Sequence, residues 1–220
     1  MIMKGSKIPH FDIGREPVHF SYRLHGSIPM PVLKAARGRR DAQLEQTRLE
    51  AKQMATGLAG QYLQRRHFGI NAQHELELDD YLHTKSNGPY HLSQSELATI
   101  VLESLRVLHD KKAVFVYVVC VMSNHVHAVL GTQEGMETVD VGVLMKSHKG
   151  FTARMCNRVL GSTGAPFWDE GYFDRTVRRG KFMRVMWYVL NNPVKAGLVE
   201  NWEDWPHTWL NPEYELLLKG

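Results

Sequence analysis

The chain has 220 residues and a mass of 25.2 kDa, which is enough for one large domain or two small ones with a real hydrophobic core. Hydrophobic residues make up 43% and charged residues 23%, which excludes a chain that is disordered throughout. The longest strongly apolar run, residues 113–122, is about half as long as a membrane-spanning helix requires, and the N-terminal residues lack the apolar core of a signal peptide. We therefore expect a globular cytoplasmic protein with no membrane partner.

The two cysteines, Cys120 and Cys156, are too few to staple a domain of this size and lack the spacing of a zinc site. The formal net charge is +4. The excess is concentrated in residues 146–184, where nine Lys or Arg residues stand against three acids, a local net charge of +6. Such a stretch suits a polyanionic partner, and it equally fits a solvated basic surface.

The first half of the chain contains one predicted strand and two predicted helices. Alternating side chains predict a strand over residues 18–24. Apolar side chains at three- and four-residue steps predict a helix over about residues 40–68 and a second over residues 93–109, where Ser93 and Glu96 have the spacing of a capping box. The apolar stripe of the second helix comprises Leu97, Val101, Leu105 and Leu108.

The second half begins with two predicted strands, residues 114–122 and 125–130, joined by a tight turn into a hairpin. A helix over residues 141–160, a strand over residues 172–177 and a helix from residue 181 to about 192 follow. The expected apolar side of the helix over residues 141–160 comprises Leu144, His148, Phe151, Met155 and Val159, opposite Lys146, Lys149 and Asn157.

This order of elements predicts an α+β fold, in which helices cover a ferredoxin-like antiparallel sheet of the split βαβ type and an extra helical segment follows the first strand. We expect a single domain over residues 1–220. It would contain a helical insert at about residues 40–110 and a C-terminal tail at about residues 200–220 that packs on the body through its tryptophans.

Two histidines, His125 and His127, flank one hydrophobic residue on a predicted strand. Residues i and i+2 of a strand point to the same side of the sheet, so the two imidazoles can bind one divalent ion. Taken alone, this pair also fits histidines that lie in a core or on a surface by chance. A metal site is therefore a hypothesis that needs a second observation.

The last predicted helix carries Tyr188 and Asn192 four residues apart, so both side chains can reach the same point in space. Lys181 and Arg184 lie on the same flank. A phenol can act as a nucleophile, an amide oxygen can act as a third metal ligand, and nearby cations favour phenolate. From the spacing alone, an aromatic side chain at the edge of the core is the simpler interpretation of Tyr188.

Several segments resemble the single-tyrosine transposases of the HUH superfamily, in which U is a hydrophobic residue. Residues 123–130, SNHVHAVL, resemble their histidine strand, and residues 188–199, YVLNNPVKAGLV, resemble the tyrosine helix of the REP-associated tyrosine transposases. Three further segments agree in the expected order: HFSYRLHGSIP, LMKSHKGFTARMCNRVLG and PFWDEGYFDRTVR. The resemblance extends from about residue 19 to residue 205 and is weakest over about residues 40–110.

The resemblance implies that His125, His127 and Asn192 bind a divalent metal, Mg²⁺ or Mn²⁺, and that Tyr188 attacks a DNA phosphodiester. Members of this family cut single-stranded DNA beside hairpins and leave a 5′-phosphotyrosine and a 3′-hydroxyl group. It thus implies a metal-dependent single-stranded DNA endonuclease and strand transferase, acting as a monomer or homodimer on hairpin-forming repetitive palindromic DNA. Candidate DNA contacts are Lys146, Lys149, Arg175, Arg178, Arg179 and Arg184.

Two other functions remain open at this point. A non-catalytic protein that binds DNA or RNA hairpins could use the same sheet and basic surface. A metal-dependent hydrolase could use the H-x-H pair, although such enzymes need a larger barrel and further ligands.

Overall fold

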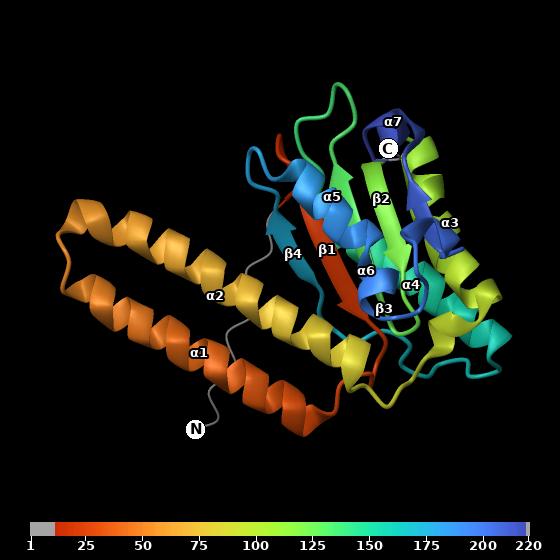
Figure 1. Ribbon diagram of the computed structural model, residues 1–220, viewed down its shortest axis with the longest axis horizontal. Helices are drawn as coiled ribbons and strands as arrows, with labels where there is room; N and C mark the ends of the chain where they lie inside the picture. The colour runs from red at the N-terminus through yellow and green to blue at the C-terminus, as the bar shows by residue number, and fades with distance from the viewer. Residues whose placement is uncertain (1–11, 219–220) are drawn as a thin grey trace. The chain divides into compact units, whose positions relative to one another are not determined.

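The computed structural model describes residues 12–218, so the first eleven and last two residues of the expected domain lie outside the described part (Figure 1). The described residues group into two compact units, one formed by residues 28–87 and the other by residues 12–27 together with 88–218. No helix among the described residues combines the length and apolar character needed to cross a membrane.

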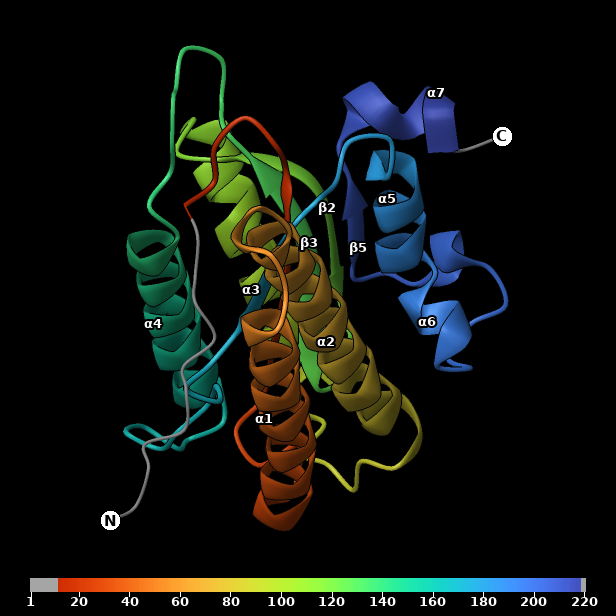
Figure 2. The same cartoon turned by 90° about the vertical axis from the view of Figure 1, so that its left-hand side faces the viewer.

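The first unit is a pair of long helices, so the prediction of one helix over residues 40–68 was wrong. α1 (Met30–Lys52) and α2 (Thr56–Thr84) lie side by side (Figures 1 and 2). α1 starts earlier than predicted because Pro31 lies in its first turn, where the missing N–H group costs no hydrogen bond. The helices separate at Ala55, which has an extended backbone (φ −59°, ψ 138°). None of the residues between the two helices, 53–55, is proline or glycine, and the apolar spacing continues across them.

The second unit is built on a five-stranded antiparallel sheet with strand order β4–β1–β3–β2–β5. The order of the first four strands is that of a split βαβ arrangement, which confirms the predicted α+β fold. The strands are β1 (Val18–Arg23), β2 (Phe115–Val121), β3 (His125–Gly131), β4 (Phe173–Thr176) and β5 (Thr208–Leu210).

The fifth strand was not predicted, because three residues are too few to show an alternating pattern. β5 pairs with β2 at the edge of the sheet. Just before β5, the indole N–H of Trp205 donates a hydrogen bond to the carbonyl oxygen of Val121 at 2.9 Å. The short segments η2 (Trp202–Asp204), η3 (Pro212–Tyr214) and α7 (Glu215–Leu218) complete the C-terminal part.

Helices cover both faces of this sheet (Figure 2). α3 (Ser95–Asp110) and α4 (Val141–Val159) pack on one face, and α5 (Phe182–Leu190) packs on the other, followed by α6 (Asn192–Lys195). The hydrophobic core is accordingly divided into two clusters by the sheet. The histidine pair and Tyr188, described below, lie on the α5 side.

The α3 stripe was predicted correctly, but the capping box was not. Ser93 lies in a preceding 3₁₀ turn, η1 (His91–Ser93), and its hydroxyl donates to the carbonyl oxygen of Tyr90 at 2.7 Å. Gln94 is the N-cap residue of α3 and makes no side-chain cap. The capping box is therefore absent, because Ser93 is not the N-cap residue that it requires.

The buried side of α4 is rotated relative to the prediction. Phe151 and Val159 are exposed, whereas Asn157 is buried and its Nδ2 donates to the carbonyl oxygen of Ala165 at 2.7 Å. The buried side instead includes Thr152, whose hydroxyl donates to a backbone carbonyl of its own helix. The polar side chains on this face are satisfied by hydrogen bonds, so polarity was a poor guide to burial.

His148, on the same face of α4, joins a buried hydrogen-bonded group. Its Nε2 lies 2.6 Å from the hydroxyl of Tyr22, and its Nδ1 lies 2.9 Å from the hydroxyl of Ser104. Burial lowers the pKa of His148 from 6.5 to about 3 and raises the pKa of Tyr22 well above its usual value of 10.0. Both side chains are therefore neutral at pH 7.

We expect the free energy of unfolding to fall as the pH decreases from about 6.5 toward 3. In this interval unfolded His148 takes up a proton and folded His148 does not, so acid favours the unfolded chain with a slope of up to about 1.4 kcal/mol per pH unit. Urea unfolding at pH 7 and pH 5 measures this difference. The variant His148→Gln should lose this component, and an unchanged pH dependence in the variant would contradict the assignment.

Candidate active site

β3 carries the histidine pair. His125 and His127 are both buried, their ring centroids lie 4.8 Å apart, and each offers a ring nitrogen within 4.8 Å of the other. The prediction that both side chains lie on one side of the strand is therefore confirmed. Backbone pairing fixes this strand, since Ser21 and Arg23 of β1 stand opposite the two histidines.

The neighbouring residue sets the tautomer of His125. Oδ1 of Asn124 lies 2.6 Å from Nδ1 of His125, so the ring donates its Nδ1 proton to the amide oxygen. The lone pair of the neutral imidazole is then on Nε2, the atom that a metal ligand needs. Asn124 was predicted only as a turn residue, so this orienting role was missed.

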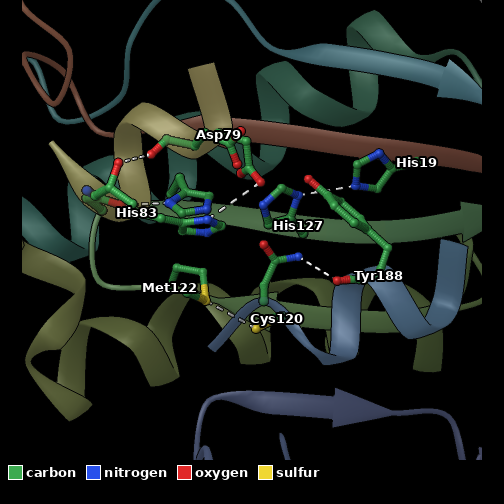
Figure 3. Close-up of polar contacts among 12 residues, drawn as sticks. His19, Asp79, His83, Cys120, Met122, His127 and Tyr188 are labelled. Atoms are coloured by element: carbon green, nitrogen blue, oxygen red, sulfur yellow. Dashed lines mark hydrogen bonds and ion pairs between the residues drawn. The ribbon is translucent and has the colours of Figure 1, made fainter. Parts of the chain in front are cut away.

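α5 places Tyr188 against the histidines (Figure 3). The phenol ring is half-buried, and its centroid lies 5.6 Å from that of His127 with an interplanar angle of 85°. The predicted nucleophile and the two predicted histidine ligands, which are more than 60 positions apart in the sequence, therefore meet on the same face of the sheet.

Asn192 follows Tyr188 by four residues in the sequence. The predicted helix over residues 181–192 is interrupted at Asn191, and Pro193 lies in the first turn of α6. Nδ2 of Asn192 donates to the carbonyl oxygen of Tyr188 at 2.7 Å, which fixes the orientation of the amide. Its Oδ1 is fully buried and accepts no hydrogen bond from any residue between 12 and 218.

These side chains fit a divalent cation. A buried amide oxygen without a hydrogen-bond donor is costly unless a ligand satisfies it. Two imidazole nitrogens and one amide oxygen form a mixed donor set that suits Mn²⁺ and also accepts Mg²⁺. The residues that could hold the ion are His125, His127 and Asn192.

His19, on β1, is a residue of the site that sequence reasoning missed. Its Nε2 lies 3.2 Å from Nδ1 of His127, and the two rings are stacked with centroids 5.3 Å apart. Its ring also meets Tyr188 edge to face, with centroids 5.6 Å apart. Local spacing could not reveal this histidine, because it reaches the site through the pairing of two distant strands.

Lys195, on α6, was also missed. Its Nζ lies 5.9 Å from the centroid of the Tyr188 ring, within the range of a cation–π contact. Helical spacing was no guide to this contact, because the helix that carries Tyr188 is interrupted at Asn191, before Lys195.

The predicted DNA contacts are distributed over both faces of the sheet. Arg178 and Arg179 are exposed between the end of β4 and α5, and Arg184 is exposed on α5 itself. Arg175 lies within β4 and is half-buried, whereas Lys146 is exposed on α4, on the opposite face. The structure thus brings the arginines near the tyrosine helix but does not bring the lysines to the same side.

Lys149 is occupied within the protein. Its Nζ donates to the carbonyl oxygens of Asp169 at 2.7 Å and Gly171 at 3.0 Å, and burial lowers its pKa to about 8. With Lys146 it lines a cleft of about 470 Å³ beside α4. Phe167 and Trp168, which also line this cleft, are buried in the core. Lys149 therefore anchors the segment before β4, and its contact with DNA stays a prediction.

The chain is similar to known proteins in part of its sequence and in its fold. Residues 85–192 match the model of a family described as IS200-like transposases, and this segment contains the histidine pair, Tyr188 and Asn192. The structure of a REP-associated tyrosine transposase bound to a REP hairpin is similar over 97% of this chain and 87% of that chain, with a TM-score of 0.52 and 12% sequence identity. At this identity the likeness shows the fold alone.

A candidate transposase from Deinococcus radiodurans R1 is similar over 86% of this chain and 98% of that chain, with 13% identity and a TM-score of 0.38 that is too low to carry an argument. None of the curated proteins matches the chain at a significant level.

Proposed function

We propose that the chain, whose residues 85–192 match the model of the IS200-like transposases, cuts and rejoins single-stranded DNA through a covalent bond to Tyr188. The observation that carries the proposal is the meeting of Tyr188 and His127, with ring centroids 5.6 Å apart on one face of the sheet. The phenol of Tyr188 thus lies beside a histidine that could bind a cation, and that cation could contact the phosphate that Tyr188 attacks.

The proposed reaction uses the phenol oxygen of Tyr188 as the nucleophile. It forms a bond to phosphorus while the bond to the 3′ oxygen breaks, and the phenol proton passes to solvent as the leaving oxygen gains one. The products are a 5′-phosphotyrosine and a 3′-hydroxyl group. A second 3′-hydroxyl can reverse the step, so strands are rejoined without ATP because the covalent bond retains the phosphodiester energy.

His125, His127 and Asn192 hold the divalent ion, Mg²⁺ or Mn²⁺, in this proposal. When bound, the ion supplies Lewis-acid polarisation of a non-bridging phosphate oxygen. The protein's own contribution is to fix the ligands before substrate arrives. Asn124 holds the ring of His125, and the backbone of Tyr188 holds the amide of Asn192.

We propose a DNA hairpin with a single-stranded flank as the substrate. A regular duplex holds its backbone in a fixed helix, whereas a single strand can bend so that a phosphate reaches Tyr188. Arg178 and Arg179 are exposed on the segment that leads into α5, and Arg184 is exposed on α5, the helix of Tyr188, so all three can follow such a backbone. The logarithm of the binding constant should fall linearly with the logarithm of the salt concentration, with a slope of about −0.7 per phosphate contacted on a single strand. The related protein whose structure contains a REP hairpin supports this choice.

All the proposed active-site side chains come from one chain. A monomer can therefore assemble the site without residues from a second copy, and we expect a monomer to be active.

Incubation of the protein with labelled hairpins from the flanks of its own gene, in Mg²⁺ or Mn²⁺, tests this function. On a denaturing gel we expect cleavage of one strand and a protein-linked fragment that carries the 5′-phosphate, with weak or no cleavage of the fully paired duplex. Cleavage without a linked fragment would indicate hydrolysis instead. Hairpin binding without cleavage would indicate a non-catalytic binding protein.

Lys195→Gln should slow formation of the covalent product by about two- to fivefold. A cation near the Tyr188 ring is worth about 0.5–1 kcal/mol at an exposed site, and here it would stabilise negative charge developing on the phenol oxygen. Single-turnover kinetics measure the rate. Lys195→Arg should retain most of it, as should Lys111→Gln at the far end of α3. Equal rates for Lys195→Gln and the wild-type protein would exclude this role.

A further inference from the structure

We propose that His19 is a positioning residue, which orients His127 as a metal ligand and at the same time holds the ring of Tyr188. This inference rests on the proposed function, because it assumes that His127 binds a cation. His19 lies on β1 and is buried, and its ring contacts the rings of both His127 and Tyr188 (Figure 3).

The contact between the two histidines allows one arrangement of protons when a cation is bound. Nε2 of His19 lies 3.2 Å from Nδ1 of His127, so one of these nitrogens donates and the other accepts. A cation takes the Nε2 lone pair of His127, which places the proton of that ring on Nδ1. His19 must then accept through Nε2 and carry its own proton on Nδ1.

An acceptor at this position has two effects on His127. It selects the tautomer in which Nε2 is the ligand atom, and it makes that nitrogen more basic. Asn124 orients His125 in the same way, because its Oδ1 accepts a hydrogen bond from Nδ1 of His125 at 2.6 Å. The site therefore has one hydrogen-bonding partner behind each imidazole ligand, contributed by a different strand or turn.

His19 also restricts the rings themselves. The planes of His19 and His127 are parallel to within 6°, with centroids 5.3 Å apart, so rotation of one ring would disturb the other. The ring of Tyr188 stands perpendicular to both, at 89° to His19 and 85° to His127. One buried side chain thus contacts both a metal ligand and the nucleophile.

The sheet gives His19 the rigidity that such a role requires. β1 lies between β3 and β4, and the backbone of His19 stands opposite Val129 on one side and Arg175 on the other. Side chains on an inner strand are placed more reproducibly than side chains on a loop.

The test compares two substitutions that differ in hydrogen-bonding capacity. His19→Gln retains an acceptor of similar reach, the amide oxygen, whereas His19→Leu has none. His207→Leu serves as the matched control, because His207 is also buried but makes its ring contact with Trp205 in the C-terminal segment. Thermal unfolding establishes that each variant is folded.

Mn²⁺ binding to the protein without DNA is then measured from the EPR signal of the unbound ion. We expect the affinity of His19→Leu to fall about 10- to 100-fold, the loss typical for an outer partner of a metal ligand. His19→Gln should stay within about threefold of the wild-type protein, and His207→Leu should match it. Pulsed EPR of the bound Mn²⁺ should show the same number of coordinated imidazoles in the wild-type protein and in His19→Gln.

Three results would overturn the inference. Wild-type affinity in His19→Leu would show that no acceptor is needed, and equal losses in His19→Leu and His19→Gln would show that the acceptor is not the cause. One fewer coordinated imidazole in His19→Gln would make His19 a ligand. If the wild-type protein itself bound no Mn²⁺, the metal part of the proposed function would fail first, which separates the two outcomes.

Discussion

Tyr188→Phe should abolish both strand cleavage and the covalent protein–DNA product, with a loss on the order of 10⁴-fold or more in rate. The substitution removes the phenol oxygen that would bond to phosphorus. The ring itself remains, so its edge-to-face contacts with His19 and His127 are kept and the fold and DNA affinity should change little. A denaturing gel measures cleavage and adduct, and a binding assay with the same hairpin measures affinity.

Tyr172→Phe is the matched control. Tyr172 is the nearest other tyrosine by sequence, but it lies just before β4, beside α4, on the opposite face from α5. Burial raises its pKa to about 12, which disfavours phenolate at neutral pH. This variant should cleave like the wild-type protein. An adduct that persists in Tyr188→Phe and disappears in Tyr172→Phe would move the nucleophile.

His125→Ala and His127→Ala should each reduce cleavage more than about 100-fold, because loss of a ligand costs more than the 10- to 100-fold typical of an outer partner. Asn192→Ala removes the buried Oδ1 and should act in the same direction. Chelation of the wild-type protein with EDTA should reproduce the loss, and added Mn²⁺ or Mg²⁺ should reverse it. Single-turnover cleavage of the hairpin measures each effect.

His207→Ala provides the control for the loss of a buried histidine. It should cleave at the wild-type rate once its folding has been verified. Full cleavage in excess EDTA, or normal cleavage by His125→Ala, would remove the metal from the mechanism and leave both histidines with a structural role.

The spacing of apolar side chains in the sequence predicted strands whose side chains alternate or are buried. The alternation in residues 18–24 and the β-branched run in residues 114–122 both correspond to strands, because a half-buried or buried strand requires those side chains. The two-residue step on a strand likewise placed His125 beside His127. Asn192 was expected on the helix of Tyr188, but that helix is interrupted at Asn191, and the amide of Asn192 donates to the backbone carbonyl oxygen of Tyr188.

The remaining features depend on contacts that no local pattern records. His19 and His127 are 108 positions apart, and their meeting depends on the register between β1 and β3. The break between α1 and α2 falls at residues 53–55, none of which is proline or glycine, and the two helices pack against each other after it.

Peptide mapping of the trapped protein–DNA adduct tests the assignment of Tyr188 most directly. Trypsin releases residues 185–195 as one peptide, in which Tyr188 is the single tyrosine. The proposed mechanism predicts that mass spectrometry finds the nucleotide on this peptide, joined through its 5′-phosphate to Tyr188. A link to another residue, or to a 3′-phosphate, would contradict it.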